Sequence, residues 1–377
     1  MMRSFGARAI GERLERMQAS PLWAGEGFRN LHPVLPGLRD ANATRPTLSE
    51  FICDAGRRVP KAPLPAADPR QAWHAAPASG LRATWLGHST VLIEIDGHRV
   101  LTDPVWGARA SPSTLAGPKR FQPVPVALKA LPAFDVVVIS HDHYDHLDYP
   151  TIRALAKTAV PFVTSLGVGA HLQAFGVASE RITELDWWQT HRVPGTGLRI
   201  SAAPSQHFSG RSLRDRNATL WSSLVIEGSR HKAFFSGDTG LTTQYAEIAA
   251  RLGPFDLVML EVGAFHASWG DIHLGPENAL KALQLLGGGT FLPVHWGGTF
   301  SLALHDWDET AETLLALAPA QGARLLMPRL GEAVEPAHVG VVLPWWRDVD
   351  AGKGRVRARA EPESPPTAAA AMPWPLD

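Results

Sequence analysis

The chain has 377 residues, of which 45% are hydrophobic and 19% are charged, so it can bury a large core and belongs to the globular class. Its 36 basic side chains balance its 36 acidic ones, which leaves no overall field to attract nucleic acid, an anionic membrane or an acidic partner. Cys53 is the only cysteine, which excludes an intramolecular disulfide and a thiolate metal cluster built by this chain alone.

The N-terminal region carries arginines throughout and lacks the apolar stretch of a signal peptide. No later run reaches the roughly 18 apolar residues that a membrane span requires. We therefore expect a cytoplasmic protein whose membrane association is at most peripheral. Ile10, Leu14 and Met17 recur at helical spacing and predict an amphipathic helix over residues 5–18. Docking on the protein's own core is the favoured role of this helix, and attachment to a membrane surface is the alternative.

Three zones of the chain differ in composition. Residues 1–79 are rich in Pro, Arg and Ala with little periodicity, and we expect an arm that wraps a core and has no independent fold. Residues 80–346 alternate short apolar runs with helical patterns, as one folded domain would. Residues 347–377 are of low complexity, which is typical of a disordered tail.

Within residues 80–346, strand-like runs meet helical ones both singly and in hairpins, and the first hairpin turns at Asp96 and Gly97. Strands are expected over residues 83–87, 91–95, 99–103, 135–140, 162–165, 198–205, 220–227, 232–237, 256–262, 290–295 and 324–328. Helices are expected over residues 151–159, around 170–175, after Gly240, and over 276–286 and 309–318. This order favours an α/β sandwich of mixed sheets with helical cover over a purely parallel sheet.

The stretch SHDHYDHLD at residues 140–148 follows the apolar run VVVI directly. A chain that leaves a strand at its C-terminal end enters the edge where open α/β folds tend to place their sites. His141, His143, Asp145 and His146 offer imidazole and carboxylate groups, which suit zinc and related divalent ions. A solvated loop is the alternative. Four potential ligands behind one buried strand favour a metal site that needs further ligands elsewhere.

Three more candidate ligands follow other apolar runs. His207 lies in PSQHFSG, Asp238 in FFSGDTG and His295 in FLPVHWGG, each among small or turn residues. A lone histidine in such a place is usually structural, but three candidates at strand ends in compatible order favour one shared site. There is no Gly-x-Ser-x-Gly elbow, so a serine nucleophile is a poor competitor.

This series of residues resembles the ligand pattern of the metallo-β-lactamase fold. Within that superfamily the chain is similar to bacterial relatives of N-acyl-phosphatidylethanolamine-hydrolysing phospholipase D and of ascorbate-phosphate lactonase. The stretches that carry the resemblance are WLGHSTVLIEIDGHRVLTDPVW, GPKRF, SHDHYDHLD, PSQHFSGR, FSGDTG, GDIHLGPENA and PVHWGGTF. The resemblance implies a four-layer αββα sandwich over residues 80–346, as the catalytic domain, with a dinuclear metal site between two sheets.

The resemblance also implies a role for each motif residue. His141, His143 and His207 would hold one metal ion, Asp145, His146 and His295 would hold the other, and Asp238 would bridge them. Zinc is the expected metal, with manganese and iron as alternatives. Catalytic roles are expected for Asp145, Asp238 and His273.

Further residues are expected to support or line the site. Asp103 in LTDPVW would orient a ligand histidine, with an ordinary Asp-Pro turn as the alternative. His88 and Trp269 would line the site. For His88 and for His273 a structural role is the alternative, and tryptophans such as Trp269 are more often core residues.

The expected reaction is hydrolysis, because two divalent ions lower the pKa of a shared water and neutralise charge in the transition state. A phosphodiester, such as an N-acyl phospholipid-like substrate, is favoured. A lactonase or other carboxylic-ester hydrolase is the first alternative, and a catalytically inactive metal-binding protein and a mononuclear iron dioxygenase are others. Lys119, Arg120 and Arg211 are candidates to pair with phosphate, with a solvated surface as the alternative.

We expect a small-molecule or lipid substrate and no nucleic acid. The charge is balanced, and the span between Asp238 and His295 is short for the second domain that RNA-processing relatives insert. The oligomeric state stays open, a homodimer included.

Overall fold

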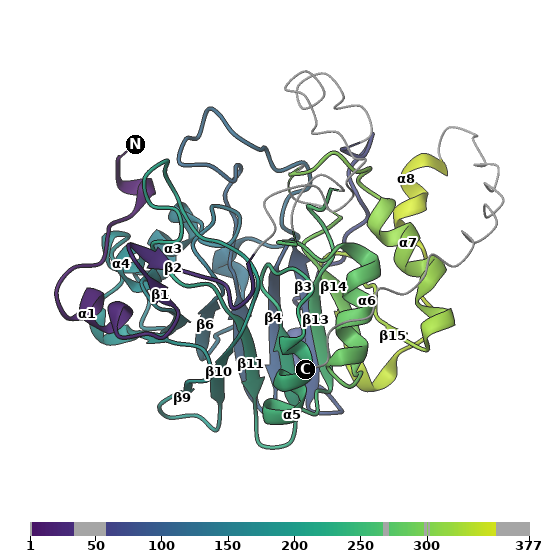
Figure 1. Ribbon diagram of the computed structural model, residues 1–377. Coiled ribbons are helices and arrows are strands. Elements are labelled where there is room, and N and C mark those ends of the chain that lie inside the picture. The colour runs from purple at the N-terminus through teal and green to yellow at the C-terminus, as the bar shows by residue number, and fades with distance from the viewer. Residues whose placement is uncertain (1, 34–57, 267–270, 298–299, 301, 352–377) are drawn as a thin grey trace.

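The computed structural model describes residues 2–33, 58–266, 271–297, 300 and 302–351. In this part of the chain two seven-stranded mixed sheets are packed together, with helices on their outer faces (Figure 1). This arrangement confirms the expected α/β sandwich of four layers.

The first sheet has the strand order β16-β3-β4-β5-β6-β7-β8. Its strands are β16 Ala333–Val334, β3 Leu81–Gly87, β4 Thr90–Ile95, β5 His98–Thr102, β6 Val136–Ile139, β7 Phe162–Ser165 and β8 Ile182–Leu185. Strands β16, β3, β4 and β5 pair antiparallel, whereas β5 to β8 pair parallel. The parallel strands β5 to β8 therefore end at one common edge of the sheet.

The second sheet has the order β15-β14-β13-β12-β11-β10-β9. Its strands are β15 Arg324–Leu325, β14 Thr290–Val294, β13 Leu257–Glu261, β12 Lys232–Phe235, β11 Ser223–Glu227, β10 Arg199–Ala203 and β9 Thr190–Arg192. Here β9 to β12 pair antiparallel and β12 to β15 pair parallel.

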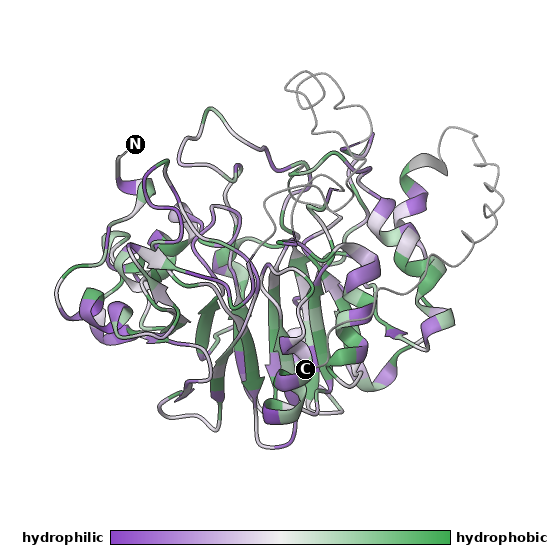
Figure 2. Cartoon of the chain, in the orientation of Figure 1, coloured by the Kyte–Doolittle hydropathy of each residue, from purple (hydrophilic) through white to green (hydrophobic). Residues whose placement is uncertain are grey.

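The apolar run VVVI in β6 shows how the layers are held together. Val136 and Val138 belong to the large core that includes strands of both sheets. Val137 and Ile139 point the other way and pack with residues of α3 and α4. A strand buried on both faces reads as a continuous apolar run, because alternate side chains enter different cores. Figure 2 shows the central strands mostly, though not wholly, in the hydrophobic colour.

Helices and short helical turns complete the structure. The α-helices are α1 Glu12–Gln18, α3 Tyr149–Leu155, α4 Val168–Ala174, α5 Gln244–Leu252, α6 Gly275–Leu285, α7 Glu309–Leu317 and α8 Asp348–Ala351. The 3-10 turns are η1 Met2–Phe5, η2 Ala72–His74, η3 Leu128–Ala130, η4 Ser179–Arg181, η5 Pro319–Gln321, η6 Pro336–His338 and η7 Trp345–Arg347. No helix in the described ranges is long and apolar enough to cross a membrane.

The N-terminal segment, residues 2–33, lies against the side of the sandwich that carries α3 and α4 (Figure 1). It contains α1 and a short hairpin of β1 Trp23–Ala24 and β2 Gly27–Phe28. The helix predicted over residues 5–18 is shorter than expected. It begins only at Glu12, because Gly11 has a left-handed backbone with φ 56°. Ile10 is 80% exposed and Met17 is buried, so the predicted apolar stripe docks only at its C-terminal end.

The C-terminal end of the described chain is helical. Residues 345–351 form η7 and α8, and Trp345 and Trp346 are buried in the large core. The rest of the predicted tail, residues 352–377, lies outside the described residues.

Candidate metal centre

The loop at residues 140–148 leaves the C-terminal end of β6 and enters α3 (Figure 1). Asp148 caps α3: its carboxylate accepts hydrogen bonds from the backbone N–H of Thr151 and, at 2.9 Å, of Gly107. Such a cap satisfies an otherwise unpaired helix-end donor. The loop is thus held at one end by the sheet and at the other by the capped helix.

The structure brings all seven predicted ligands together in two adjoining groups. The first group contains three predicted histidines and the predicted bridging aspartate, and its donor atoms lie within 4.8 Å of one another. In it, Nδ1 of His143 lies 2.9 Å from Nε2 of His141 and 3.2 Å from Nε2 of His207. We name this set group A: His141, His143, His207 and Asp238.

A second set of donor atoms, also within 4.8 Å of one another, adjoins group A. Asp145 Oδ2 lies 3.4 Å from Nε2 of His146 and 3.3 Å from Nε2 of His295. His88 also belongs to it, with Nε2 2.8 Å from the same carboxylate oxygen. We name this set group B: His88, Asp145, His146 and His295.

Asp238 lies between the two groups. Its Oδ2 is 3.9 Å from His141 Nε2 and 3.8 Å from His207 Nε2 in group A. On the side of group B, Oδ1 is 3.2 Å from His146 Nε2 and Oδ2 is 3.2 Å from His295 Nε2. A single carboxylate therefore faces histidines of both groups.

The donor set fits divalent metal ions. Among the described residues, His146 Nε2 and Asp238 Oδ1 are buried and make no hydrogen bond. Buried polar atoms are normally paired, so two such atoms facing each other call for a further partner. Imidazole nitrogens and carboxylate oxygens in this number are the ligands that zinc, manganese and iron accept.

Burial and neighbouring charges shift the pKa values of the donor residues in different directions. Burial lowers the pKa of His141 and of His207 well below the usual value, so both imidazoles are neutral, as ligands must be. Burial also opposes a charge on His295, but the nearby carboxylates, Asp238 first, raise its pKa to about 10. His146 and His295 in turn hold the pKa of Asp238 well below its usual value despite burial. A cation bound there would act on the two carboxylates in the same direction.

Hydrogen bonds fix the orientation of the donor histidines. Asp103 Oδ2 accepts from His146 Nδ1 at 2.7 Å and from Ser140 Oγ at 2.6 Å, and Asp103 Oδ1 accepts from Ser140 N–H at 2.8 Å. Ser140 Oγ also lies 2.9 Å from His141 Nδ1. His207 Nδ1 donates to the Ile272 carbonyl at 2.8 Å. Such partners set the tautomer and aim of a ligand ring, which is the arrangement expected for Asp103.

Three residues of the centre have left-handed backbones. His88, Asp103 and His295 have φ values of 52°, 30° and 64°, a conformation that non-glycine residues adopt at a cost of about 1–3 kcal/mol. His295 N–H also donates to the His88 carbonyl at 3.0 Å. The two strand ends that carry these histidines are therefore tied together by the backbone.

Of the residues expected to surround the ligands, His273 lies at the edge of the centre. One of its donor atoms lies within 4.8 Å of donor atoms of Asp238 and His295, and its Nδ1 is 3.3 Å from Glu261 Oε1. His88, which was expected to line the site, is itself one of the donor residues of group B. Trp269 lies outside the described residues.

Arg211 does not face the site as a phosphate partner would. It is buried and donates to the carbonyls of Asp142 at 2.5 Å, Leu147 at 3.0 Å and Ser4 at 2.8 Å. Its guanidinium also lies 4.0 Å from the centre of the Tyr144 ring. The sequence did not reveal this position of Arg211, because three of its four contacts are to backbone carbonyls and all four join residues far apart in the chain. Arg211 therefore holds the backbone of the loop at residues 140–148, which we call the metal loop.

Arg120 resembles Arg211 in its contacts, whereas Lys119 fits the alternative of a solvated surface. Arg120 donates to the carbonyls of Gly107 at 3.0 Å and Val105 at 2.7 Å, and lies over the Phe300 ring. Lys119 is exposed.

Asp142 lies between His141 and His143, where the sequence suggested only a spacer, and its side chain makes several contacts. Its buried carboxylate accepts from Gly210 N–H at 2.8 Å and from Thr219 Oγ1 at 2.9 Å, and lies 3.4 Å from His171 Nε2. Burial would raise its pKa, but these contacts, His171 first, lower it. Asp142 joins the metal loop to the loop that follows His207.

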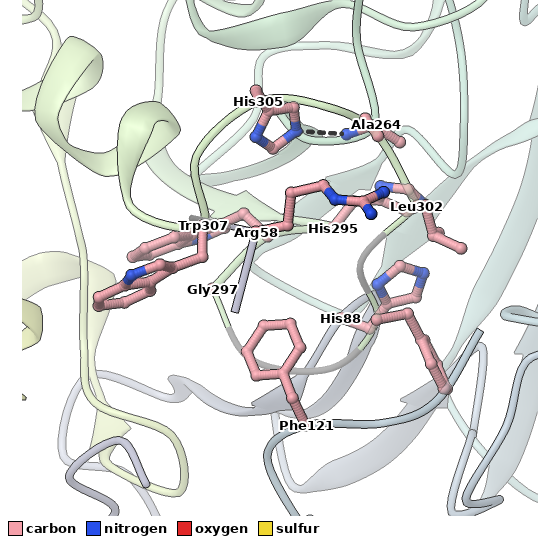
Figure 3. A pocket seen from close by; sticks show the side chains of 12 residues that line it. Arg58, His88, Phe121, Ala264, His295, Gly297, Leu302, His305 and Trp307 are labelled. Carbon is pink, nitrogen blue, oxygen red and sulfur yellow. Dashed lines mark hydrogen bonds between the residues drawn. The ribbon is translucent and has the colours of Figure 1, made fainter. Parts of the chain in front are cut away.

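A pocket of about 360 Å³, its open mouth included, adjoins group B and is lined by His88 and His295. Its walls include Phe121 and Trp307, and Figure 3 shows the side chain of Arg58 running across it. Phe121, Trp307 and Arg58 thus give this pocket both apolar and cationic walls.

Comparisons with known proteins bear on the same region. A family model described as a β-lactamase superfamily domain matches residues 98–296, which include seven of the eight donor residues of groups A and B. The chain belongs to the metallo-β-lactamase superfamily.

Relatives in the superfamily include proteins of bacteria and animals. An uncharacterized protein of Mycobacterium tuberculosis (strain ATCC 25618 / H37Rv) is 46% identical over 348 residues, which cover 91% of this chain and 92% of that protein. N-acyl-phosphatidylethanolamine-hydrolyzing phospholipase D 1 of Caenorhabditis elegans is 35% identical over 271 residues, covering 68% of this chain and 76% of that protein.

Solved structures in the superfamily share the fold. A metallo hydrolase from Ignicoccus hospitalis has a TM-score of 0.52 at 22% identity and covers 67% of this chain and 97% of its own. An isothiocyanate hydrolase from Delia radicum gut bacteria has a TM-score of 0.53 at 23% identity, with 67% and 98% covered. At these identities the likeness shows the superfamily fold alone.

Proposed function

We propose that the protein is a metal-dependent hydrolase that holds two divalent ions, zinc being the first choice, and cleaves a phosphodiester. The observation that carries this proposal is the position of Asp238. One carboxylate lies between two complete donor groups, with histidines of both within 3.9 Å of its oxygens. This is the donor arrangement that a pair of metal ions sharing one bridging ligand requires.

In this proposal, group A holds one ion, Asp145, His146 and His295 hold the other, and Asp238 is shared. When bound, such a pair lowers the pKa of a water between the ions and offsets charge that develops on the substrate. The chain itself fixes the ligands: Asp103 keeps a proton on His146 Nδ1, and the Ile272 carbonyl keeps one on His207 Nδ1. Both rings therefore present Nε2 to the centre.

In this proposal two further side chains contact the substrate. Asp145 Oδ2 accepts from His88 Nε2, so His88 adds a proton donor at the rim of group B that also lines the pocket. Glu261 lies beside Nδ1 of His273 and accepts the Leu274 N–H, which holds the His273 ring at the edge of the centre. We assign these two histidines to positioning the substrate and its leaving group.

A phosphodiester is supported over other esters by the phospholipase D of C. elegans, which is 35% identical to this chain over 271 residues, or 68% of the chain. Two ions sharing Asp238 also suit a phosphoryl centre, because each can meet one of its anionic oxygens. The Arg58 side chain and the apolar walls of the adjoining pocket fit a substrate that joins an anionic group to an apolar one, as a lipid does.

The test is metal analysis of anaerobically purified protein followed by a substrate panel on the same preparation. We expect two zinc ions per chain and the highest kcat/KM on bis-aryl phosphodiesters or N-acyl phospholipids. A preference of about a hundredfold for lactones or a chromogenic cephalosporin, or about 2.7 kcal/mol in transition-state binding, would overturn the phosphodiester assignment. One iron per chain would instead indicate the dioxygenase, and bound metal without turnover an inactive binding protein.

A further inference from the structure

Asn30, in the N-terminal segment, contacts a donor residue of group A that lies 177 positions away. Its side-chain Nδ2 donates to the His207 carbonyl at 2.8 Å, and its Oδ1 accepts from the His207 N–H at 3.1 Å. The same oxygen accepts from Trp221 Nε1 at 3.1 Å. The amide of Asn30 thus pairs with both backbone groups of His207, as a neighbouring strand would.

His207 lies in a stretch without helix or strand, after the end of β10. Its N–H and carbonyl are bound by Asn30, and its ring Nδ1 donates to the Ile272 carbonyl. These three hydrogen bonds fix both the backbone and the ring, which leaves Nε2 aimed at His143 and Asp238. In a loop, where no strand pairing holds the backbone, Asn30 supplies the pairing that the sheet does not.

Asn30 is itself held rigidly. The hairpin that precedes it places Phe28 in a small buried core with Met17, Leu22 and Trp221. Phe28 N–H donates to the Asn217 carbonyl at 2.8 Å, and Arg29 N–H donates to the Leu22 carbonyl at 3.0 Å. The side chain of Asn30 therefore approaches His207 from a fixed point.

The N-terminal segment also reaches the other loop of group A. The Ser4 carbonyl accepts from Arg211, which donates to the Asp142 carbonyl between His141 and His143. The Ala7 N–H donates to His171 Nδ1 at 3.1 Å, and the other ring nitrogen of His171 faces the Asp142 carboxylate. Both loops that carry histidines of group A are thus in contact with the same segment.

We propose that Asn30 is a positioning residue for the metal centre and that the N-terminal segment, through it, sets the affinity of group A for its ion. The inference rests on the proposed two-ion site. It goes beyond a wrapping arm, which would stabilise the whole domain without preference for either ion.

The experiment uses the full chain in wild type, Asn30→Ala and Asn30→Asp. Asn30→Ala removes all three hydrogen bonds, whereas Asn30→Asp keeps an acceptor for His207 N–H and Trp221 Nε1 and loses the donor to the His207 carbonyl. Arg16→Ala is the matched control, because Arg16 ties α1 to the Glu184 carbonyl and the Gln189 side chain and touches no ligand loop. Each metal-free protein is titrated with Co²⁺ and with Zn²⁺ against a competing chelator, and its Tm is measured.

We expect Asn30→Ala to weaken the binding of one of the two ions by about 10- to 100-fold, the range seen when partners of metal ligands are lost. The affinity for the other ion should stay within about threefold of wild type. Asn30→Asp should fall between wild type and Asn30→Ala. Equal weakening of both ions, or weakening by Arg16→Ala to the same degree, would show that the segment only stabilises the fold and would overturn the inference. Wild-type protein that binds fewer than two ions would instead remove the proposed function.

Discussion

Asp103 holds His146 and the start of the metal loop together through three hydrogen bonds in a fully buried place. Burial raises its pKa, although His146 and Ser140 act in the opposite direction. The contact to His146 Nδ1 decides which ring nitrogen faces the centre. Asp103, which is not among the proposed ligands, thereby controls the orientation of one that is.

We predict that Asp103→Asn lowers metal affinity by about 10- to 100-fold, because the amide can turn its NH₂ group toward His146 Nδ1 and disfavour the required tautomer. Chelator competition measures the change. Asp96→Asn is the matched control, since Asp96 also has three such contacts, with two backbone N–H groups and a histidine Nδ1, at the opposite end of the sheets. Unchanged affinity in Asp103→Asn would contradict the role assigned to Asp103.

Ser89 tests the absence of a side-chain nucleophile. Its Oγ is buried and makes no hydrogen bond among the described residues, although it adjoins His88. We predict that Ser89→Ala and Cys53→Ser each keep at least about half of wild-type kcat/KM, because bound water is the attacking group in the proposed reaction. Loss of turnover in Ser89→Ala at full metal content would refute that mechanism.

At the scale of elements, a contact between two turns joins the sheets at the end opposite the metal centre. Asp96, in the turn between β4 and β5, accepts from Arg230 N–H at 2.7 Å and from His231 N–H at 3.0 Å, and lies 2.7 Å from His231 Nδ1. Residues 230 and 231 lie in the turn between β11 and β12. Burial raises the pKa of Asp96, but these donors outweigh it and bring the pKa to about 2.

We predict that Asp96→Asn destabilises the fold by about 1.5–3 kcal/mol at pH 7, as expected for hydrogen bonds to a charged group. The folded pKa lies below the ordinary value of 3.8, so the wild-type advantage is complete above pH 3.8 and is lost as the pH falls toward 2. Denaturant unfolding of both proteins between pH 2 and 7 measures it. A difference that stays constant over this range would contradict the assignment.

The sequence predicted most elements because their signals are local. The run VVVI and the short apolar runs of β3 to β5 indicate buried strands by their composition alone, and turn residues such as those at 96 and 97 mark where these strands end. The donors were predictable for the same reason: a polar residue directly after a buried strand lies at a sheet edge, and parallel strands share that edge. His141, Asp238 and His295 all follow this rule.

What the sequence did not reveal depends on contacts between distant residues. Nothing near Asn30 indicates that it pairs with His207, and nothing near Arg211 indicates that it is buried against backbone carbonyls. The N-terminal helix starts later than predicted, because the apolar spacing includes Ile10 whereas Gly11, with its positive φ, precedes the first helical residue. Side-chain contacts to the backbone leave no periodic pattern, so periodicity cannot find them.

At the scale of the whole molecule, the donors come from both sheets. His141, His143, Asp145 and His146 follow β6 of the first sheet, and His207, Asp238 and His295 follow strands of the second. An ion bound between them stabilises the folded state, because the unfolded chain cannot present these ligands together.

We predict that removal of metal with a chelator abolishes hydrolysis and lowers Tm, and that zinc or manganese restores both. Free zinc at about a thousand times its Kd contributes about 4 kcal/mol per site. Calorimetry and assay of the same samples measure the two effects, with a calcium addition as the control for a metal that prefers oxygen ligands. Full activity in metal-free protein would contradict the proposed function.

The contact of Asp96 with residues 230 and 231, placed opposite the metal centre, has a mechanical consequence. Asp96 and its donors join the two sheets at one end, and at the other end bound ions would add to the backbone contact between His295 and His88. Loss of the ions would therefore weaken only the end that carries the donor residues. In metal-free protein we expect the layers to separate first at that end, so that amide exchange spreads inward from β6 and β12.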